Sequence, residues 1–273
     1  MTFIIRLSAI ALFVVILCCH SCIEIYSEKS VIYEFPKTVQ LTNIPISNYQ
    51  QFCPGSILLV DSLFIILDKC DEYLFHCYVR KGMKYIGGFG YHGKGPSEFF
   101  DPELMEWQYT DINNIEFMVC EPNLNKISRI NLRKGLSGDK EFVTSIISLP
   151  SILTYPDQIS FLDEQTVVGR CSYCPGRMFI HDLDFDTTGW VDFFPPVSKP
   201  TREDKQSELY NSIIKVSSKH ERIVSAMMSF ERIDIFSYRG ELELSIILDN
   251  NNPEPDFSDV TKLMSDDTYQ YYI

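Results

Sequence analysis

Tyr78-Val79-Arg80-Lys81-Gly82 is one of four short segments that follow the same plan along this chain. Each segment starts in an apolar run, passes through a polar turn that ends in Gly, and leads into another apolar run. The other three are Asn131-Leu132-Arg133-Lys134-Gly135, Phe185-Asp186-Thr187-Thr188-Gly189 and Phe236-Ser237-Tyr238-Arg239-Gly240. The four glycines are 53, 54 and 51 residues apart. Self-similarity at this period, in units that read as strands only, predicts a repeat architecture of the β-propeller type.

Each unit contains four short β-rich runs bounded by Asn, Asp, Gly or Pro, and no segment keeps a helical period for more than two turns. The expected strands of the first two units are 56–60, 63–67, 73–79, 85–89, 104–109, 115–120, 126–132 and 142–149. Those of the next two are 158–162, 166–170, 178–183, 190–194, 209–216, 222–227, 232–238 and 241–248. We therefore predict an all-β fold, a β-propeller of four-stranded blades with about four complete blades.

The end of the chain resembles the opening of a fifth unit. Two more apolar runs, 260–264 and 268–273, follow a polar loop, and the last of them reaches the final residue. Because an open ring exposes apolar faces and unpaired strand edges, this pattern predicts a shortened version of a longer protein. The alternative is a four- or five-bladed ring that closes with an N-terminal strand at 31–35.

The first 22 residues have the features of a targeting segment. Arg6 precedes an apolar run from Leu7 to Leu17, which is too short to span a bilayer comfortably and suits a signal peptide. A Cys directly after such a run is typical of a bacterial lipoprotein, in which that Cys is acylated. Cys22, preceded by Ser21, is the favoured lipidation site, and Cys19 is the alternative. An ordinary secretory signal is the competing interpretation. The predicted division is a signal peptide at 1–22 and a propeller domain at 23–273.

The chain has a formal net charge of −13 over 273 residues. An acidic surface repels phosphate backbones, so we expect no nucleic acid among its partners. Six cysteines lie beyond the signal region, in a compartment that permits disulfides, but the sequence does not determine their pairing. Cys171-Ser-Tyr-Cys174 is interpreted as a turn disulfide or as two free thiols, since no second Cys or His pair lies at a zinc-site spacing.

The stretch 57–102 resembles the TolB-like six-bladed propeller lipoproteins of Bacteroidota. Their first blade ends in a G-x-G-P-x-E-F/L loop, which Gly93, Gly95, Pro96, Glu98 and Phe99 match. The Tyr-rich segment 267–273 resembles a strand of a later blade in that family. The resemblance implies six blades, a lipid anchor and a location in the cell envelope, facing the periplasm or the cell surface. The resemblance therefore implies an incomplete six-bladed ring.

Two motifs partly match known binding sites, one for a nucleotide and one for calcium. Residues 88–94 match the first seven places of a Walker A loop, but Gly95 stands where Ser or Thr should hold magnesium, so we expect no nucleotide. In this loop we expect Glu98 to cap backbone N–H groups. Asp182, Asp184 and Asp186 share one face of an expected strand, and a solvated face is favoured over a calcium site. We predict no metal and no cofactor.

No catalytic constellation stands out, so the favoured function is a non-enzymatic binding or scaffold module for an envelope protein, a peptide or a glycan. The candidate rim residues in the Gly-rich loop are Tyr91, His92, Lys94 and Glu98. The alternative is an envelope hydrolase or lyase whose site collects residues from several blades in the central funnel. Its suspects lie near the ends of the second strands and are Asp68, Asp71, Glu121 and Arg170. A shortened, inactive product is the third interpretation.

Overall fold

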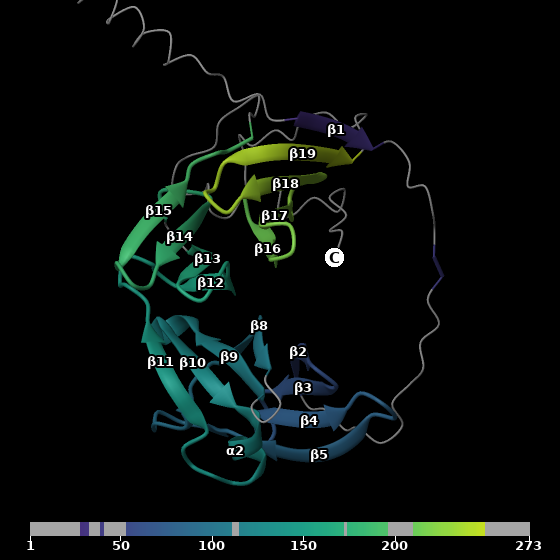
Figure 1. Ribbon diagram of the computed structural model, residues 1–273, viewed down its shortest axis with the longest axis vertical. Helices are drawn as coiled ribbons and strands as arrows, with labels where there is room; N and C mark the ends of the chain where they lie inside the picture. Colours follow the sequence, from purple (N-terminus) through teal and green to yellow (C-terminus); the bar gives the residue numbers. More distant parts are fainter. Residues whose placement is uncertain are drawn as a thin grey trace, which may run out of the picture.

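The computed structural model describes residues 28–32, 39–40, 53–110, 115–171, 174–195 and 210–248. Four small antiparallel sheets stand around a common axis as the blades of a β-propeller (Figure 1). The predicted all-β propeller of four-stranded blades is therefore confirmed. Blade 1 contains β2 (Pro54–Val60), β3 (Leu63–Asp68), β4 (Phe75–Val79) and β5 (Lys84–Phe89). Blade 2 contains β8 (Glu103–Thr110), β9 (Ile115–Glu121), β10 (Lys126–Asn131) and β11 (Val143–Ser148).

The third and fourth blades repeat this arrangement. Blade 3 contains β12 (Pro156–Phe161), β13 (Thr166–Cys171), β14 (Met178–Asp182) and β15 (Thr187–Val191). Blade 4 contains β16 (Ser212–Ser217), β17 (Arg222–Met227), β18 (Arg232–Ser237) and β19 (Leu242–Leu248). The first strands β2, β8, β12 and β16 lie nearest the axis, where β2 contacts β8, β8 contacts β12 and β12 contacts β16. The inner strands of the four blades thus border one central space, and the described sheets form an arc that is open between blade 4 and blade 1 (Figure 1).

The blades are held together by apolar clusters between their faces. Successive residues of a strand point to opposite faces, so one strand supplies two clusters. On β9, Phe117 packs in the cluster between blades 1 and 2, whereas Met118 packs in the cluster between blades 2 and 3. On β13, Val167 faces blade 2 and Val168 faces blade 4. This use of both faces explains why the second strands are nearly continuous apolar runs.

The expected strand boundaries agree with the structure to within a few residues, and 222–227 agrees at both ends with β17. The repeated glycines do not all have the predicted role. Gly82 and Gly240 lie in the turn between the third and fourth strands, both with φ of +79°, where Gly is favoured. Gly135 instead lies in the helix α2 (Leu132–Leu136) and Gly189 lies inside β15. The prediction that all four glycines end the same turn was therefore wrong for Gly135 and Gly189. In blade 2, Asn131 caps a helix instead, and in blade 3, Asp186 takes the left-handed position of the turn.

Three small elements lie outside the blades. The η1 turn (Pro122–Leu124) joins β9 to β10, and the strands β6 (Tyr91–His92) and β7 (Glu98–Phe99) pair within the Gly-rich loop. An N-terminal strand, β1 (Glu28–Ile32), pairs in parallel with β19 at the outer edge of blade 4 and begins three residues before the expected 31–35. The expected fifth unit and the signal peptide lie outside the described residues. In the described part of the chain, no helix is both long and apolar enough to cross a membrane.

Candidate functional site

The inner strands of three blades are irregular at the same place. The register shifts between Pro54 and Ile57 on β2, between Leu104 and Gln108 on β8, and between Asp157 and Ser160 on β12. A β-bulge breaks strand pairing and re-aims side chains, and bulges are over-represented next to active sites. The residues inside the shifts that face the axis are Gly55, Ser56, Met105, Glu106, Gln158 and Ile159. The bulges therefore direct a set of side chains into the central space.

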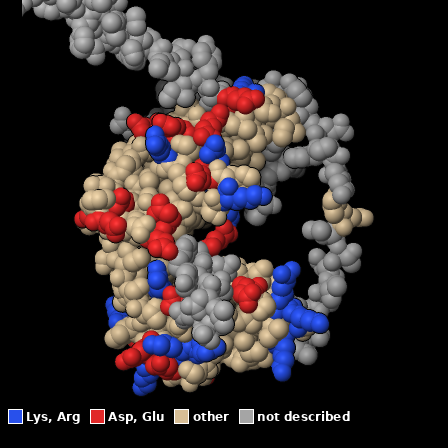
Figure 2. Space-filling model, viewed as in Figure 1, with Lys and Arg blue, Asp and Glu red and all other residues tan. Residues whose placement is uncertain are grey.

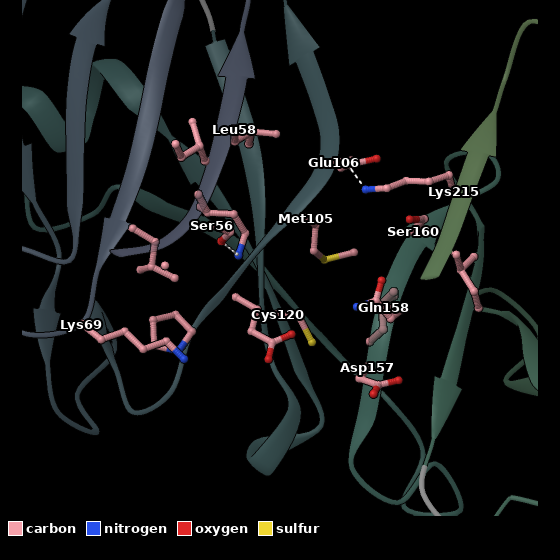
Figure 3. A pocket seen from close by; sticks show the side chains of 18 residues that line it. Ser56, Leu58, Lys69, Met105, Glu106, Cys120, Asp157, Gln158, Ser160 and Lys215 are labelled. Atoms are coloured by element: carbon pink, nitrogen blue, oxygen red, sulfur yellow. Dashed lines mark hydrogen bonds and ion pairs between the residues drawn. The ribbon is translucent and has the colours of Figure 1, made fainter. Parts of the chain in front are cut away.

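These side chains line a cavity of about 510 Å³ between the four inner strands (Figure 3). Met105 of β8 points into the cavity, with Gln158 and Ser160 of β12 on its far side. No aromatic side chain is among the residues that line it, all of which lie in the described part of the chain. The walls combine aliphatic side chains with charged groups of both signs.

Most charged groups at the cavity have a partner within the protein. Lys215 of β16 pairs with Glu106 of β8 across the axis (Figure 3). The Nζ of Lys69 lies 2.5 Å from Oδ1 of Asp101. These pairs are largely exposed and contribute little to stability, so a ligand can replace them at low cost.

Asp157 is held more firmly. Arg170 donates from Nε to Oδ1 at 3.0 Å and from Nη2 to Oδ2 at 2.7 Å, which is the bidentate geometry of a strong ion pair. Glu103, in contrast, has no ion pair with another described residue. Partial burial raises its pKa, the Asp157 and Asp101 carboxylates raise it further, and Lys69 opposes the rise. The cavity thus holds two carboxyl groups in different environments.

Gln158 has an unusual backbone. Its φ is +51°, in the left-handed region, and Tyr155 just before β12 has φ of +47°. Such conformations are uncommon in residues other than Gly and tend to occur at functional sites. Gln158 is exposed and lies inside the register shift of β12, and this bulge accounts for its left-handed conformation. It places a flexible amide in the wall of the cavity.

The sequence-based suspects for catalysis occupy other positions. Buried Asp68 accepts hydrogen bonds from the backbone N–H groups of Cys53 and Cys70, at 3.2 and 3.0 Å. Buried Glu121 accepts from the backbone N–H of Phe100 at 2.7 Å and pairs with a lysine. Asp71 lies 3.3 Å from the imidazole of His76. Arg170 lies behind the cavity wall and holds Asp157, which lines it. None of the four suspects lines the cavity.

The Gly-rich loop lies at the edge of blade 1. Glu98 turns inward, and its Oε2 accepts a hydrogen bond from the backbone N–H of Gly95 at 2.9 Å, which confirms its predicted capping role. His92 is exposed, and its Nε2 lies 2.9 Å from the carbonyl oxygen of Lys69. Tyr91 packs on Tyr73, and Lys94 lies over Phe100. None of the four candidate rim residues lines the cavity, although His92 adjoins it through Lys69.

Of the six cysteines in the described part of the chain, four form two disulfides. Cys53 is bonded to Cys70, and Cys171 is bonded to Cys174, which confirms the turn disulfide that was one of the two interpretations of that motif. Cys77 and Cys120 are free and buried. Burial raises the pKa of each thiol to about 12. Thiols of such high pKa are poor nucleophiles, so these two residues serve the core.

Sequence reasoning did not identify the residues that line the cavity. Glu106 and Lys215 interrupt apolar inner strands, and that interruption is the signal available in the sequence. A polar residue in a half-buried strand usually faces solvent, so the signal does not distinguish a wall of the funnel from an outer surface.

The chain is similar in fold to solved propellers. It aligns with a protein of Bacteroides fragilis that is predicted to be exported, at 15% identity and a TM-score of 0.49, over 86% of this chain and 64% of that one. A DUF4221 family member from Bacteroides vulgatus aligns at 10% identity and a TM-score of 0.50, over 76% and 60%. A virginiamycin B lyase from Staphylococcus aureus aligns at 14% identity and a TM-score of 0.44, over 76% and 59%. The chain spans about three fifths of the length of these proteins.

No family model and no curated protein matches the chain. At these identities the solved structures establish the propeller fold alone. The TolB-like assignment and the count of six blades stay predictions.

Proposed function

We propose that this protein is a cell-envelope β-propeller that binds a short peptide segment of an envelope protein in its central cavity, without converting it. The observation that carries the proposal is the set of three β-bulges that aim side chains of neighbouring blades into one space. Binding sites are concave and supplied with convergent polar groups, and this cavity has both features, although its lining is more polar than that of most ligand pockets.

A peptide suits the walls better than a glycan does. Lys215 and Glu106 provide both signs of charge, and Ile57, which is 62% exposed, provides apolar surface. A peptide carries charged and apolar side chains together. Exposed ion pairs can rearrange around different sequences. Among the described side chains that line the cavity, none is an aromatic ring on which a sugar could stack.

The test is titration calorimetry with two sets of probes, short peptides of mixed charge and neutral oligosaccharides. We expect peptides to bind, and K215A and Q158A to weaken that binding about fivefold or more each, as loss of a polar contact costs on the order of 1 kcal/mol. K219A is the matched control, since Lys219 is an exposed residue of the same blade outside the cavity. Binding of oligosaccharides alone, or equal effects of K215A and K219A, would contradict the proposal.

One observation favours an enzymatic alternative. Glu103 has a raised pKa while Asp157 is held by Arg170, and two carboxyl groups in unlike environments are the pattern of an acid and its anionic partner in hydrolases and lyases. Under this alternative, E103Q abolishes turnover of a bound substrate and leaves its affinity unchanged. Unchanged chemistry of every bound probe in the wild-type protein excludes it.

The envelope location rests on the signal-like N-terminus, in which Cys22 is the proposed acylation site. Two or more acyl chains hold a protein on a membrane far more firmly than one. Metabolic labelling with an alkyne fatty acid tests the anchor. C22S is expected to lose the label and C19S to keep it, and the reverse result would assign the anchor to Cys19.

A further inference from the structure

The hairpin between the third and fourth strands differs in charge from blade to blade. In blade 1 it carries three basic residues, Arg80, Lys81 and Lys84, and no acidic one. In blade 3 the equivalent hairpin carries three aspartates, Asp182, Asp184 and Asp186, and no basic residue. The corresponding segments of blades 2 and 4 mix both signs. In every blade this segment joins the third strand to the fourth. The fold itself therefore does not require basic residues in blade 1 and acidic residues in blade 3.

The two charged hairpins lie on opposite sides of the molecule. In Figure 2, Lys and Arg side chains gather at the β4–β5 end of blade 1, and Asp and Glu side chains gather at the β14–β15 end of blade 3. The whole chain has a net charge of −13, so a basic surface is the exception on this protein. An anionic partner is attracted most strongly to the hairpin that carries no acidic residue, which favours one orientation of the protein on it.

The basic side chains of blade 1 are free to make external contacts. Arg80, Lys81 and Lys84 are all exposed, and none of the three has an ion pair with another described residue. The neighbouring β2–β3 turn contributes one carboxylate, Asp61, and is tied to the hairpin by the Arg80 N–H, which donates to the Ser62 carbonyl at 2.8 Å. The tip therefore keeps an excess of positive charge.

Apolar side chains flank this charge. Tyr85 is 47% exposed and Ile86 is 41% exposed. Ile86 is the extra residue of a bulge, because Tyr78 pairs with Tyr85 and Cys77 pairs with Gly87. A bulge re-aims its side chain, here at the edge of the blade. Cations beside an aromatic ring and an aliphatic group form the composition that lies at membrane interfaces, where charge meets the headgroups and rings lie at their level.

We propose that the β4–β5 hairpin is a docking surface for a membrane with anionic headgroups. Arg80, Lys81 and Lys84 lie against lipid phosphates, Tyr85 and Ile86 enter the headgroup layer, and the aspartates of blade 3 point away. A soluble polyanion would pair with the three cations but would make no favourable contact with the exposed Tyr85 and Ile86 side chains. Each Lys or Arg near an anionic surface adds about fivefold to partitioning, and the effect falls within a Debye length.

The test measures amine acetylation by mass spectrometry on the full chain mixed with vesicles. Vesicles of phosphatidylcholine alone are compared with vesicles that also contain phosphatidylglycerol. We expect Lys81 and Lys84 to react at least about fivefold more slowly on the anionic vesicles, and high salt to restore their rates. Lys140 and Lys219 are exposed residues of blades 2 and 4 and serve as internal controls that should not change.

A pair of variants completes the test. R80Q/K81Q/K84Q should sediment with anionic vesicles at least about tenfold more weakly than wild type, and R133Q/K134Q/K140Q, which removes as many charges from the blade 2 hairpin, should not. Equal effects of the two variants, or no slowing at Lys81 and Lys84, overturn the proposal. Slowing by heparin but not by vesicles overturns it in favour of an acidic polymer. Peptide titration of the cavity is independent of this hairpin, so failure of one proposal leaves the other standing.

Discussion

Arg170 of β13 joins Asp157 of β12 to the next blade. Its Nε and Nη2 donate to the two carboxylate oxygens of Asp157, and its Nη1 donates to the backbone carbonyl oxygen of Ser212, in blade 4, at 3.2 Å. One guanidinium thus fixes a wall of the cavity and the position of β16. Positional precision of this kind is what a binding site built from several blades needs.

We expect R170A to lower the free energy of unfolding by roughly 1–2 kcal/mol, since it removes three hydrogen bonds of a partly buried charged group. Urea titration measures this loss. R222A is the control, because the Arg222–Glu243 pair is exposed and lies within blade 4, so its loss should cost less than about 0.5 kcal/mol. Equal losses in the two variants would show that Arg170 does not link the blades.

Gly90 lies where a methyl group does not fit. Its φ is +76°, and a Cβ at this position would lie 2.7 Å from Cδ2 of the buried Phe75. Gly138 has nearly the same φ, +77°, with nothing within 4 Å of the added Cβ. G138A therefore measures the backbone term alone, about 1 kcal/mol, whereas G90A adds overpacking and should cost roughly 2–4 kcal/mol. Equal losses on thermal or urea unfolding would show that Phe75 moves aside freely.

The strands could be predicted because their ends are marked in the sequence. Asp61-Ser62 between two apolar runs predicts the β2–β3 turn, and the strands on either side begin and end close to the expected residues. The bulges could not be predicted, because a register shift depends on which residues of two strands face one another. The same reason applies to Gly189, which stands two residues inside a strand while Asp186 makes the turn.

The cavity could not be predicted either, because its walls come from strands that are far apart in the sequence. Glu106 and Lys215 are 109 residues apart in sequence and meet across the axis. The suspects Asp68 and Glu121 were chosen as polar residues at the ends of second strands. In the structure, each accepts a hydrogen bond from the backbone N–H of a neighbouring loop residue. A capping carboxylate and a ligand-binding carboxylate are the same residue types in the sequence. Only their spatial neighbours distinguish them, and those neighbours come from distant segments of the chain.

Cys77 and Cys120 should resist thiol reagents in the folded protein. The thiolate is the reactive form, and a pKa of about 12 leaves almost none of it at pH 8. Iodoacetamide followed by peptide mass spectrometry is expected to modify both residues only in denaturant, and an exposed cysteine introduced as S151C is expected to react at once. Cys120 lies in the wall of the cavity but is only 3% exposed. Fast modification of Cys120 in the folded protein would therefore show that the cavity wall opens.

Glu103 should make stability depend on pH. Its pKa in the folded protein is raised above the ordinary value of 4.5, so the protein favours the protonated form. The stability that this group contributes is full below pH 4.5 and is lost as the pH rises through the folded pKa. We expect E103Q to be more stable than wild type at pH 7, by less than about 1 kcal/mol because the side chain is partly solvated, and to lose that advantage below pH 4.5. E164Q, at an exposed turn, is the control, and an advantage of E103Q that did not change with pH would contradict this assignment.

Asp234 is a fully buried carboxylate that accepts hydrogen bonds from three side chains. It is 0% exposed and accepts from Arg177 Nη1 at 2.5 Å, Arg232 Nε at 2.7 Å and Ser245 Oγ at 2.8 Å. Arg177 precedes β14 of blade 3, so its bond to Asp234 on β18 joins two blades in their interior. D234N leaves two arginines facing a neutral amide, and we expect it to cost about 3–5 kcal/mol or to prevent folding.

A milder variant keeps this prediction testable if D234N does not fold. S225A removes one hydrogen bond, from Arg177 Nη2 to Ser225 Oγ at 2.9 Å, and should cost about 1–2 kcal/mol in urea titration because the donor is buried and charged. D186N is the control for the loss of a carboxylate, since Asp186 has an 80% exposed side chain and should change stability by less than about 0.5 kcal/mol. If D234N were no more costly than D186N, the Arg177–Asp234 pair would contribute little to the joining of blades 3 and 4, and the apolar cluster and the Arg170–Ser212 hydrogen bond would account for it.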